Sequence, residues 1–244
     1  MGENYRLRLD KVLAHLGFGS RKEIKGIVRS GQVSVNSIVV KTPDMHVWPY
    51  RDVIEVDGNQ VVYREYVYIM MNKPKGVLSA TEDAFGKVVV DLLKPEHRAF
   101  EPFPVGRLDK DTEGLLLLTN DGKLAHKLLS PKKHVPKTYF AKIEGEVTND
   151  DCVAFSKGIV LEDGYKTLPG ELRTIKSGSE SEVEVTIYEG KFHQIKRMFI
   201  ALGKRVIYLK RLSMGGLVLD SQLDYGNYRE LTDKELEQVL AVTE

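Results

Sequence analysis

The stretch GRLDKDTEGLLLLTNDG, from Gly106 to Gly122, decides the fold of this chain. Its four consecutive leucines, at 115–118, lie between polar segments, a pattern typical of a strand buried on both faces. The NDG sequence at 120–122 then predicts a tight turn, because these residue types tolerate left-handed backbone conformations. Asp109 and its charged neighbours therefore lie on a loop that leads into a rigid core strand. Loops held by rigid scaffolds often carry catalytic groups, although many charged loops are simply solvated.

The same loop also resembles the first half of a calcium-binding loop. Asp109, Asp111 and Gly114 match the start of the pattern D-x-D-x-[DN]-G, although Glu113 occupies its fifth position. The complete motif needs a bidentate glutamate at its twelfth position, where this chain has Asn120. Its later positions would also fall on the leucines that the core strand requires. We therefore exclude a calcium site and expect no bound metal.

The composition is that of a globular protein without disulfides. The chain has 244 residues, of which 42% are hydrophobic and 29% are charged, enough for a sizeable core and a soluble surface. Its single cysteine, Cys152, excludes an internal disulfide and a multi-cysteine metal site. No apolar stretch approaches the roughly 20 residues of a membrane helix, and the first ten residues lack a signal-peptide core. We expect a cytoplasmic protein with no membrane partner.

The charge is distributed unevenly along the chain. The net charge is only +1, yet residues 5–41 contain eight basic and two acidic residues. A small basic module is therefore joined to a mildly acidic body. Clustered lysine and arginine side chains are what binding to a phosphate backbone requires, so the module is a candidate for RNA contact.

Two helices and several short strands are predicted in this module. Apolar spacing predicts a helix over 8–16, and a capping box of Ser20 and Glu23 begins a second helix that ends near Gly31. Basic residues recur every four positions on this second helix and form one stripe, which is either an RNA-binding surface or an ordinary solvated face. The candidate RNA-binding side chains of the module are Arg8, Arg21, Lys22, Lys25 and Arg29.

The remaining patterns divide the chain at a predicted linker over 59–65, giving domains of residues 1–64 and 65–244. Short strands are expected at 33–35, 38–40 and 52–57 before the linker. The body is expected to have strands at 66–71, 115–119, 138–144, 182–188 and 205–209, and helices over 191–202 and after the capping box of Thr232 and Glu235. Strands do not alternate regularly with helices, which favours an α+β fold over a doubly wound sheet.

Four motifs in the body resemble, in the same order, those of the pseudouridine synthases. They are NKPKG at 72–76, GRLD at 106–109, KTY at 137–139 and EGKFHQIKRMF at 189–199. The chain is similar to the branch that modifies ribosomal RNA and includes the RsuA enzymes. The opening RLDKVL, at 8–13, resembles that of the small RNA-binding domain named after ribosomal protein S-four. The resemblance implies a mixed, largely antiparallel sheet with the active site in a cleft along it.

The resemblance also implies the chemistry. Pseudouridine formation breaks the bond between ribose C1′ and uracil N1 and rejoins C1′ to uracil C5. The product is an isomer, so no cofactor is expected. Positive charge that develops on the sugar calls for a nearby carboxylate, which the resemblance assigns to Asp109. Asp109 attacks C1′ or removes the C2′ proton, and both routes stay open. The target base must first be turned out of the RNA.

Further site residues follow from the same resemblance. Lys196 is the expected cationic partner of Asp109, where many relatives carry arginine, and Tyr139 is expected to stack on the uracil. The catalytic candidates are thus Asp109, Tyr139 and Lys196, and the substrate-binding candidates are Arg107, Leu217, Lys73 and Arg211. The body's RNA-binding candidates are Lys132, Lys133 and Lys137. His193 is left out, because a histidine at a helix end is more often structural or in contact with RNA.

Several functions remain in competition. The favoured one is isomerisation of a uridine in small-subunit (16S) ribosomal RNA by a monomeric enzyme that acts on free RNA or an assembly intermediate. The HVPKTY and FHQIKRM segments favour the small over the large subunit. The alternatives are a large-subunit enzyme, a non-catalytic RNA-binding or ribosome-assembly protein, and a nucleosidase or glycosidase. A nucleosidase usually pairs two carboxylates, whereas only Asp109 has a motif around it here.

Overall fold

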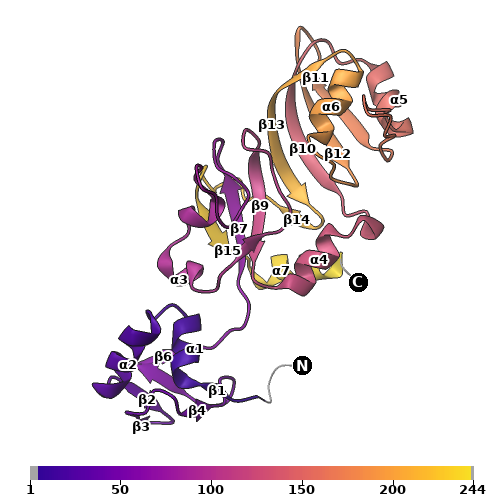
Figure 1. The fold of residues 1–244 in the computed structure, drawn as a ribbon. Coiled ribbons are helices and arrows are strands. Elements are labelled where there is room, and N and C mark those ends of the chain that lie inside the picture. Colours follow the sequence, from indigo (N-terminus) through magenta and orange to yellow (C-terminus); the bar gives the residue numbers. More distant parts are fainter. Residues whose placement is uncertain (1–4, 243–244) are drawn as a thin grey trace. The chain divides into compact units, whose positions relative to one another are not determined.

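The computed structural model describes residues 5–242 and divides them into two compact units (Figure 1). The first unit runs to Val67 and also includes Leu93–Pro102, which contains the short helix α3 (Pro95–Arg98). The Phe100 ring lies 4.7 Å from the His15 ring and under the guanidinium of Arg64 at 4.9 Å, which ties this segment to the N-terminal unit. The predicted division between residues 64 and 65 did not include residues 93–102 in the first unit, because no sequence pattern indicated that this later segment returns to it.

The first unit contains the two predicted helices and two small sheets. Helices α1 (Leu9–His15) and α2 (Arg21–Arg29) pack their apolar faces on the strands, and the capping box of Ser20 and Glu23 is confirmed. Strands β2, β3, β5 and β6 form a sheet in the order β3-β2-β5-β6, and β1 pairs with β4. The strands are β1 (Leu7–Arg8), β2 (Val33–Val35), β3 (Ile38–Val39), β4 (His46–Val47), β5 (Ile54–Val56) and β6 (Asn59–Val61).

Both hairpins of this sheet depend on left-handed turn residues. Asn36 and Ser37, between β2 and β3, have φ angles of 52° and 66°, as a two-residue hairpin requires. Asp57 and Gly58, with φ angles of 51° and 77°, make the equivalent turn between β5 and β6. The prediction of a linker over 59–65 is therefore wrong for its first part, because this turn sends the chain back as strand β6.

The second unit is built on one nine-stranded sheet with the path β11-β12-β10-β13-β9-β7-β15 (Figure 1). All its ladders are antiparallel except that between β9 and β13, which confirms an α+β fold with a largely antiparallel sheet. Its strands are β7 (Tyr68–Lys73), β8 (Phe103–Pro104), β9 (Glu113–Thr119), β10 (Lys137–Glu144), β11 (Glu171–Lys176), β12 (Glu180–Ile187), β13 (Arg205–Met214), β14 (Leu217–Val218) and β15 (Tyr228–Glu230). The helices are η1 (Val89–Leu92), α4 (Gly122–Leu129), η2 (Pro131–Lys133), α5 (Asn149–Lys157), α6 (Gln194–Ala201) and α7 (Asp233–Ala241).

The leucine strand β9 lies inside this sheet, as predicted, and Leu115–Leu118 are buried on both faces. Gly114 at its start has a φ of +100°, and a Cβ atom there would lie 2.3 Å from the carbonyl oxygen of Arg211. Only glycine therefore allows β9 to approach β13 at the point where Arg211 pairs with Gly114. This close approach brings the loop around Asp109 to the β13 side of the sheet.

The NDG sequence after β9 does not form the predicted tight turn. Asp121 is instead the N-cap of α4, and its Oδ1 accepts hydrogen bonds from the backbone N–H groups of Lys123 and Leu124, both at 3.0 Å. An aspartate at this position satisfies N–H groups that a helix start leaves unpaired. The chain therefore passes directly from the core strand into a helix.

Two hydrophobic clusters lie against the sheet of the second unit. In one, Phe155 of α5 and Phe199 of α6 pack on β10 and β12, with ring centroids 5.2 Å apart. In the other, Leu124 of α4 and Val239 of α7 pack on β9. Helix α6 is thus anchored by its buried face, which leaves its first turn free to project toward the loop that bears Asp109.

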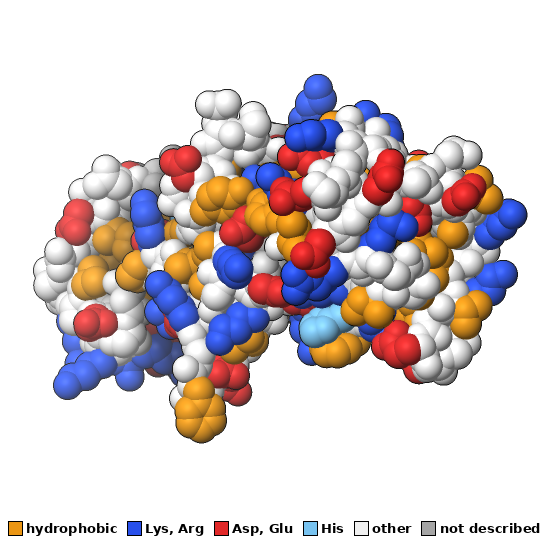
Figure 2. All heavy atoms as spheres, turned by 90° about the horizontal axis from the view of Figure 1, so that it is seen from above, with side chains coloured by type: hydrophobic (Ala, Val, Ile, Leu, Met, Phe, Trp, Pro, Cys, Tyr) orange, Lys and Arg blue, Asp and Glu red, His pale blue; other side chains and the backbone are white. Residues whose placement is uncertain are grey.

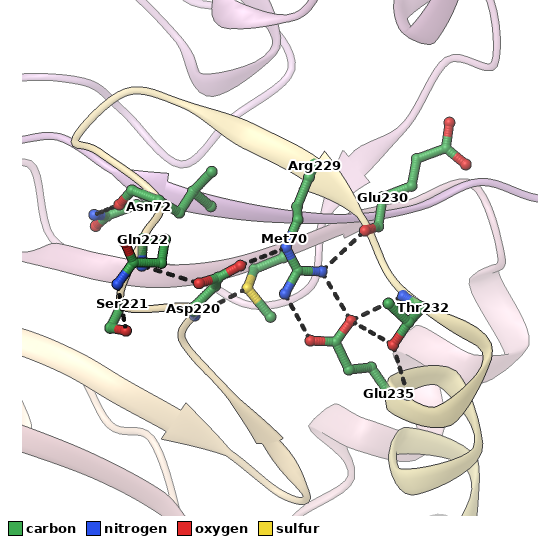
Figure 3. A network of polar contacts seen from close by, with 10 residues as sticks. Met70, Asn72, Asp220, Ser221, Gln222, Arg229, Glu230, Thr232 and Glu235 are labelled. Carbon is green, nitrogen blue, oxygen red and sulfur yellow. Dashed lines mark hydrogen bonds and ion pairs between the residues drawn. The ribbon is translucent and has the colours of Figure 1, made fainter.

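Arg229 fastens the C-terminal elements to the edge of the sheet (Figure 3). Its guanidinium donates to both carboxylate oxygens of Glu235, each at 2.8 Å, and to Asp220 at 2.7 Å. These bonds to Arg229 outweigh burial and lower the pKa of Glu235 to about 2. Glu235 also completes the predicted capping box with Thr232, which is confirmed. The network holds α7 and β15 against β7, the strand that ends in Lys73.

None of the helices within residues 5–242 combines the length and the apolar character needed to cross a bilayer.

Candidate active site

The loop that bears Asp109 is held from beneath by the end of β7 and the segment after it. Lys73 has no exposed surface, and its ammonium donates to the carbonyl oxygens of Pro74, Asp109 and Thr112 at 3.1, 3.2 and 2.9 Å. The backbone N–H of Gly76 donates to Lys110 at 2.7 Å. Lys73 was predicted as a substrate contact, but its burial makes it a support of the loop instead.

Two side chains from the start of α6 face the Asp109 carboxylate. The Nζ of Lys196 lies 3.2 Å from Oδ2, and the Nε2 of His193 lies 3.6 Å from Oδ1. His193 is the N-cap residue and Lys196 the third residue of α6, so the helix start presents both on one face. The Asp109 side chain is 27% exposed, which leaves it accessible to a substrate while two potential cations approach it.

Lys196 is shared between two carboxylates. It also bonds Asp111 at 2.7 Å, a partner that the motif comparison did not indicate. Burial lowers the pKa of the Lys196 ammonium, but the hydrogen bond to Asp111 and the charge of Asp109 outweigh it, so its pKa is raised. For Asp111, burial raises the pKa and the bond to Lys196 more than offsets it. The Lys196 ammonium and the Asp111 carboxylate therefore stay charged at neutral pH.

A small pocket opens beside this cluster. Tyr139, which is 7% exposed, lines it together with the apolar side chains of Leu108, Ile187, Ile195 and Leu209. Leu217 was predicted to line the base pocket, but it does not line the pocket at Asp109. It packs in the other hydrophobic cluster, against α4 and α7, because β14 folds back along the far end of β13.

His193 is the site residue that sequence reasoning set aside. It adopts a left-handed backbone conformation (φ 49°), uncommon outside glycine, and its ring stacks on the exposed Phe192 at 3.8 Å. The helix predicted over 191–202 begins only after this turn. The sequence signal that could have identified His193 was its three-residue spacing from Lys196. Residues three positions apart share a face of a helix, so the start of α6 at this point places both side chains on the same side.

The remaining predicted contacts lie around this pocket. Arg107 is exposed and lines it directly, and Lys132 and Lys133 are exposed on η2. Lys137 and Arg211 line a second cavity that shares Tyr139 with the first. Figure 2 shows a face on which basic and acidic side chains gather around a histidine. No cluster of three or more metal-ligating side chains occurs in the described part of the chain.

The predicted stripe on α2 is exposed. Arg21, Lys22, Lys25 and Arg29 project to the solvent, and no ion pair with an acidic residue is found for them within residues 5–242. Arg8 differs, because its guanidinium is bound to the buried Asp10 at 2.7 and 3.0 Å. Arg8 therefore stabilises the start of α1, and four basic side chains remain available to a phosphate backbone.

The relatives of this chain agree with the resemblance. An RNA pseudouridine synthase of Bacillus subtilis is 54% identical over 94% of this chain and 97% of its own. The ribosomal large subunit pseudouridine synthase B of the same organism is 42% identical, with 97% of each chain covered. The ribosomal small subunit pseudouridine synthase A of Vibrio cholerae is 39% identical over 96% of this chain and 99% of its own.

The fold is shared as well. A crystal structure of a pseudouridylate synthase superposes with a TM-score of 0.67 at 34% identity, covering 96% of this chain and 99% of that chain. Residues 7–49 match the S4 domain, and residues 67–201 match the RNA pseudouridylate synthase family. The chain therefore belongs to the RNA pseudouridine synthases, which are isomerases, and carries an S4 domain at its N-terminus.

Proposed function

We propose that this chain converts a uridine in ribosomal RNA to pseudouridine with Asp109 as its catalytic carboxylate, and that the substrate is the small-subunit (16S) RNA. The observation that carries the proposal is the Asp109 carboxylate 3.2 Å from the Lys196 ammonium, at a pocket lined by Tyr139. A non-catalytic RNA-binding protein would have no need of this combination.

The reaction requires a charged carboxylate at the edge of an apolar pocket. The bond from C1′ to N1 breaks, uracil turns, C1′ joins C5, and the proton on C5 is finally lost while N1 gains one. Asp109 stabilises or captures the sugar cation formed when the first bond breaks. Lys196 keeps a negative charge at this half-buried position favourable, because a nearby cation offsets the cost of burial.

The pocket walls suit a flipped uracil. Tyr139 presents an aromatic ring for stacking, and Leu108, Ile187, Ile195 and Leu209 supply an apolar lining that excludes water. Arg107 is exposed at the rim and forms no ion pair with another described residue, so it is available to the RNA backbone. The uracil would thus be held between the aromatic ring and the apolar wall while its ribose faces Asp109.

The S4 domain supports ribosomal RNA as the partner, and its boundary at residue 64 remains part of the proposal. The basic stripe on α2 gives this domain four exposed cations for the RNA backbone. We further propose that the enzyme acts as a monomer in the cytoplasm. The ribosomal RNA named for the relatives favours this location.

The relatives include enzymes of both ribosomal subunits, so each subunit's RNA has some support as the substrate. The HVPKTY and FHQIKRM segments favour the small subunit, and the small subunit pseudouridine synthase A of Escherichia coli is 37% identical over 96% of this chain. The large-subunit enzyme of Bacillus subtilis, at 42% identity, makes the large-subunit RNA the second candidate.

Pseudouridine mapping on transcripts of both ribosomal RNAs tests the proposal. After incubation with the purified chain, we expect one new pseudouridine in the small-subunit transcript. A new site only in the large-subunit transcript would transfer the proposal to that RNA, and no site in either would reject it.

The role of Lys196 gives the first prediction. Lys196→Ala should lower the single-turnover rate by about 10²-fold, since it removes a preorganised charge beside Asp109. Lys196→Arg should retain most of the rate because the charge remains. The measurement is tritium release from C5-labelled RNA. Arg197→Ala is the matched control, because Arg197 lies on the same helix as Lys196 but bonds Glu162 and does not line the pocket at Asp109. Equal rates for both Lys196 variants would remove this charge from the mechanism.

The stripe on α2 gives the second prediction. Replacing Arg21, Lys25 and Arg29 by glutamine should reduce the slope of log affinity against log salt by roughly 2–3, at about 0.7–0.9 per lost phosphate contact. The rate at saturating RNA should stay unchanged. Filter binding of a ribosomal RNA transcript over a salt series measures the slope. The control replaces the exposed Lys157, Lys166 and Lys176 of the second unit by glutamine. An unchanged slope in the stripe variant would make the stripe a solvated surface.

A further inference from the structure

A second cavity adjoins the pocket at Asp109. It has a volume of about 390 Å³, within the range of roughly 300–1,000 Å³ of small-molecule sites. Arg107, Tyr139, Gly190 and Lys191 line both cavities, so the two are neighbours that share a wall. A base bound in the first cavity would therefore have its attached sugar and phosphate groups within reach of the second cavity.

Two cations of the second cavity, the buried Arg211 and the half-buried Lys137, have no acidic partner among the described residues. Arg211 is 2% exposed, its Nε donates to the carbonyl oxygen of Leu115 at 2.7 Å, and its buried Nη2 has no hydrogen-bond partner among residues 5–242. Lys137 donates to the carbonyl oxygen of Val135 at 2.8 Å and forms no ion pair with a described residue. A buried guanidinium N–H without an acceptor is costly, so its retention indicates a site for an anion.

The carboxylate in the cavity wall does not neutralise these cations. Glu189 accepts hydrogen bonds from the Tyr165 hydroxyl at 2.6 Å and from the backbone N–H of Leu168 at 2.9 Å. The side-chain amide of Gln194 donates a third bond to it at 2.9 Å. Glu189 therefore uses its carboxylate oxygens to hold the cavity wall together. It forms no ion pair with Lys137 or Arg211.

We propose that this cavity binds the phosphate of the RNA linkage next to the target uridine, with Lys137 and Arg211 as its ligands. The inference deepens the proposed function and rests on it. The aromatic side chains of Tyr165 and Tyr188 line the same cavity and flank the neighbouring nucleotide. Because Tyr139 borders both cavities, a phosphate here and a uracil beside Tyr139 would place the intervening ribose toward Asp109.

The electrostatics of Lys137 agree with an anion site. Burial, followed by the nearby charge of Arg211, lowers the pKa of Lys137 to about 8. A bound phosphate would restore the charged form and raise this pKa. Below about pH 8 the lysine is charged with or without RNA, whereas above it the bound form holds more protons. RNA affinity should therefore fall as the pH rises above 8.

Binding of a short RNA with and without backbone charge tests the proposal. The probes are a six-nucleotide oligouridylate and the same oligomer with uncharged methylphosphonate linkages, titrated into the full chain. Lys137→Met should weaken binding of the charged oligomer by about tenfold and leave the uncharged one unaffected. Lys137→Arg should restore binding to within about twofold, since it keeps the charge. Lys127→Met, an exposed lysine on α4, is the control and should leave both affinities unchanged.

The pH dependence separates an anion ligand from a structural role. Between pH 7 and 9 the affinity of the wild-type chain for the charged oligomer should fall relative to that of Lys137→Arg. The other groups that line the cavity are unchanged in this comparison: Arg107, His134, Tyr139, Tyr165, Tyr188, Glu189, Lys191 and Arg211. The hydrogen bonds of Tyr165 to Glu189 and of Tyr188 to Glu171 raise the pKa of both phenols, so they stay protonated.

The outcomes distinguish this inference from the proposed function. Equal loss of both oligomers in Lys137→Met, or parallel pH profiles, would overturn the phosphate site even if the enzyme modifies ribosomal RNA. Conversely, a selective loss of the charged oligomer supports the site even if pseudouridine mapping finds no product, in which case only the proposed function fails.

Discussion

Replacing Asp109 with asparagine is expected to lower pseudouridine formation by at least about 10³-fold, because the amide keeps the shape of the carboxylate but not its charge. Binding to RNA should change by less than about twofold, since the phosphate contacts are made by other side chains. Tritium release from C5-labelled ribosomal RNA measures the first effect, and filter binding with the same transcript measures the second.

Asp111→Asn is the matched control for this variant. Asp111 also bonds Lys196, but its side chain is 58% exposed and does not line the pocket. We expect a rate loss of less than about tenfold from it, because an exposed ion pair contributes little. Near-normal turnover of Asp109→Asn, together with an inactive Asp111→Asn, would move the catalytic role to Asp111.

Replacing Lys73 with methionine is expected to have the second largest effect, on stability and activity together. Three backbone carbonyl oxygens would lose their buried donor, which should cost about 3 kcal/mol of unfolding free energy. The loop would no longer be held at Asp109, so kcat should fall more than RNA affinity does. Urea unfolding at pH 7 and single-turnover kinetics measure the two effects. The control is Lys75→Met, at an exposed position two residues away.

The pH dependence of this stability difference has a defined sign. Burial lowers the pKa of Lys73 to about 8, although the charges of Asp111, Glu113 and Asp109 oppose the shift. In the unfolded chain the Lys73 pKa has its ordinary value of 10.5, so between about pH 8 and 10.5 this lysine binds more protons in the unfolded than in the folded state. The free energy of unfolding of the wild type should therefore rise with pH in this range, relative to that of Lys73→Met. A methionine variant as stable and as active as the wild type would show that these hydrogen bonds do not hold the loop.

The local elements could be predicted because their signals are carried by neighbouring residues. The capping boxes at Ser20 and Thr232 depend on residues three positions apart, and both are confirmed. The leucine run required burial on both faces, which a strand inside a sheet provides. Asp121 shows the limit of this reasoning, because aspartate suits both a turn and an N-cap. The choice depended on α4 packing against β9.

The amino-acid sequence by itself determined the α+β class, the basic N-terminal helices, the family motifs and the place of Asp109 before a core strand. Only the tertiary structure decided which side chains surround that carboxylate. It brought His193 and Asp111 into the cluster, buried Lys73 beneath the loop, and moved Leu217 into a separate part of the core. The reason is physical: helix and strand patterns arise from neighbours in the chain, whereas the site depends on the approach of β9 to β13 and on the register of α6, which are set by packing between distant segments.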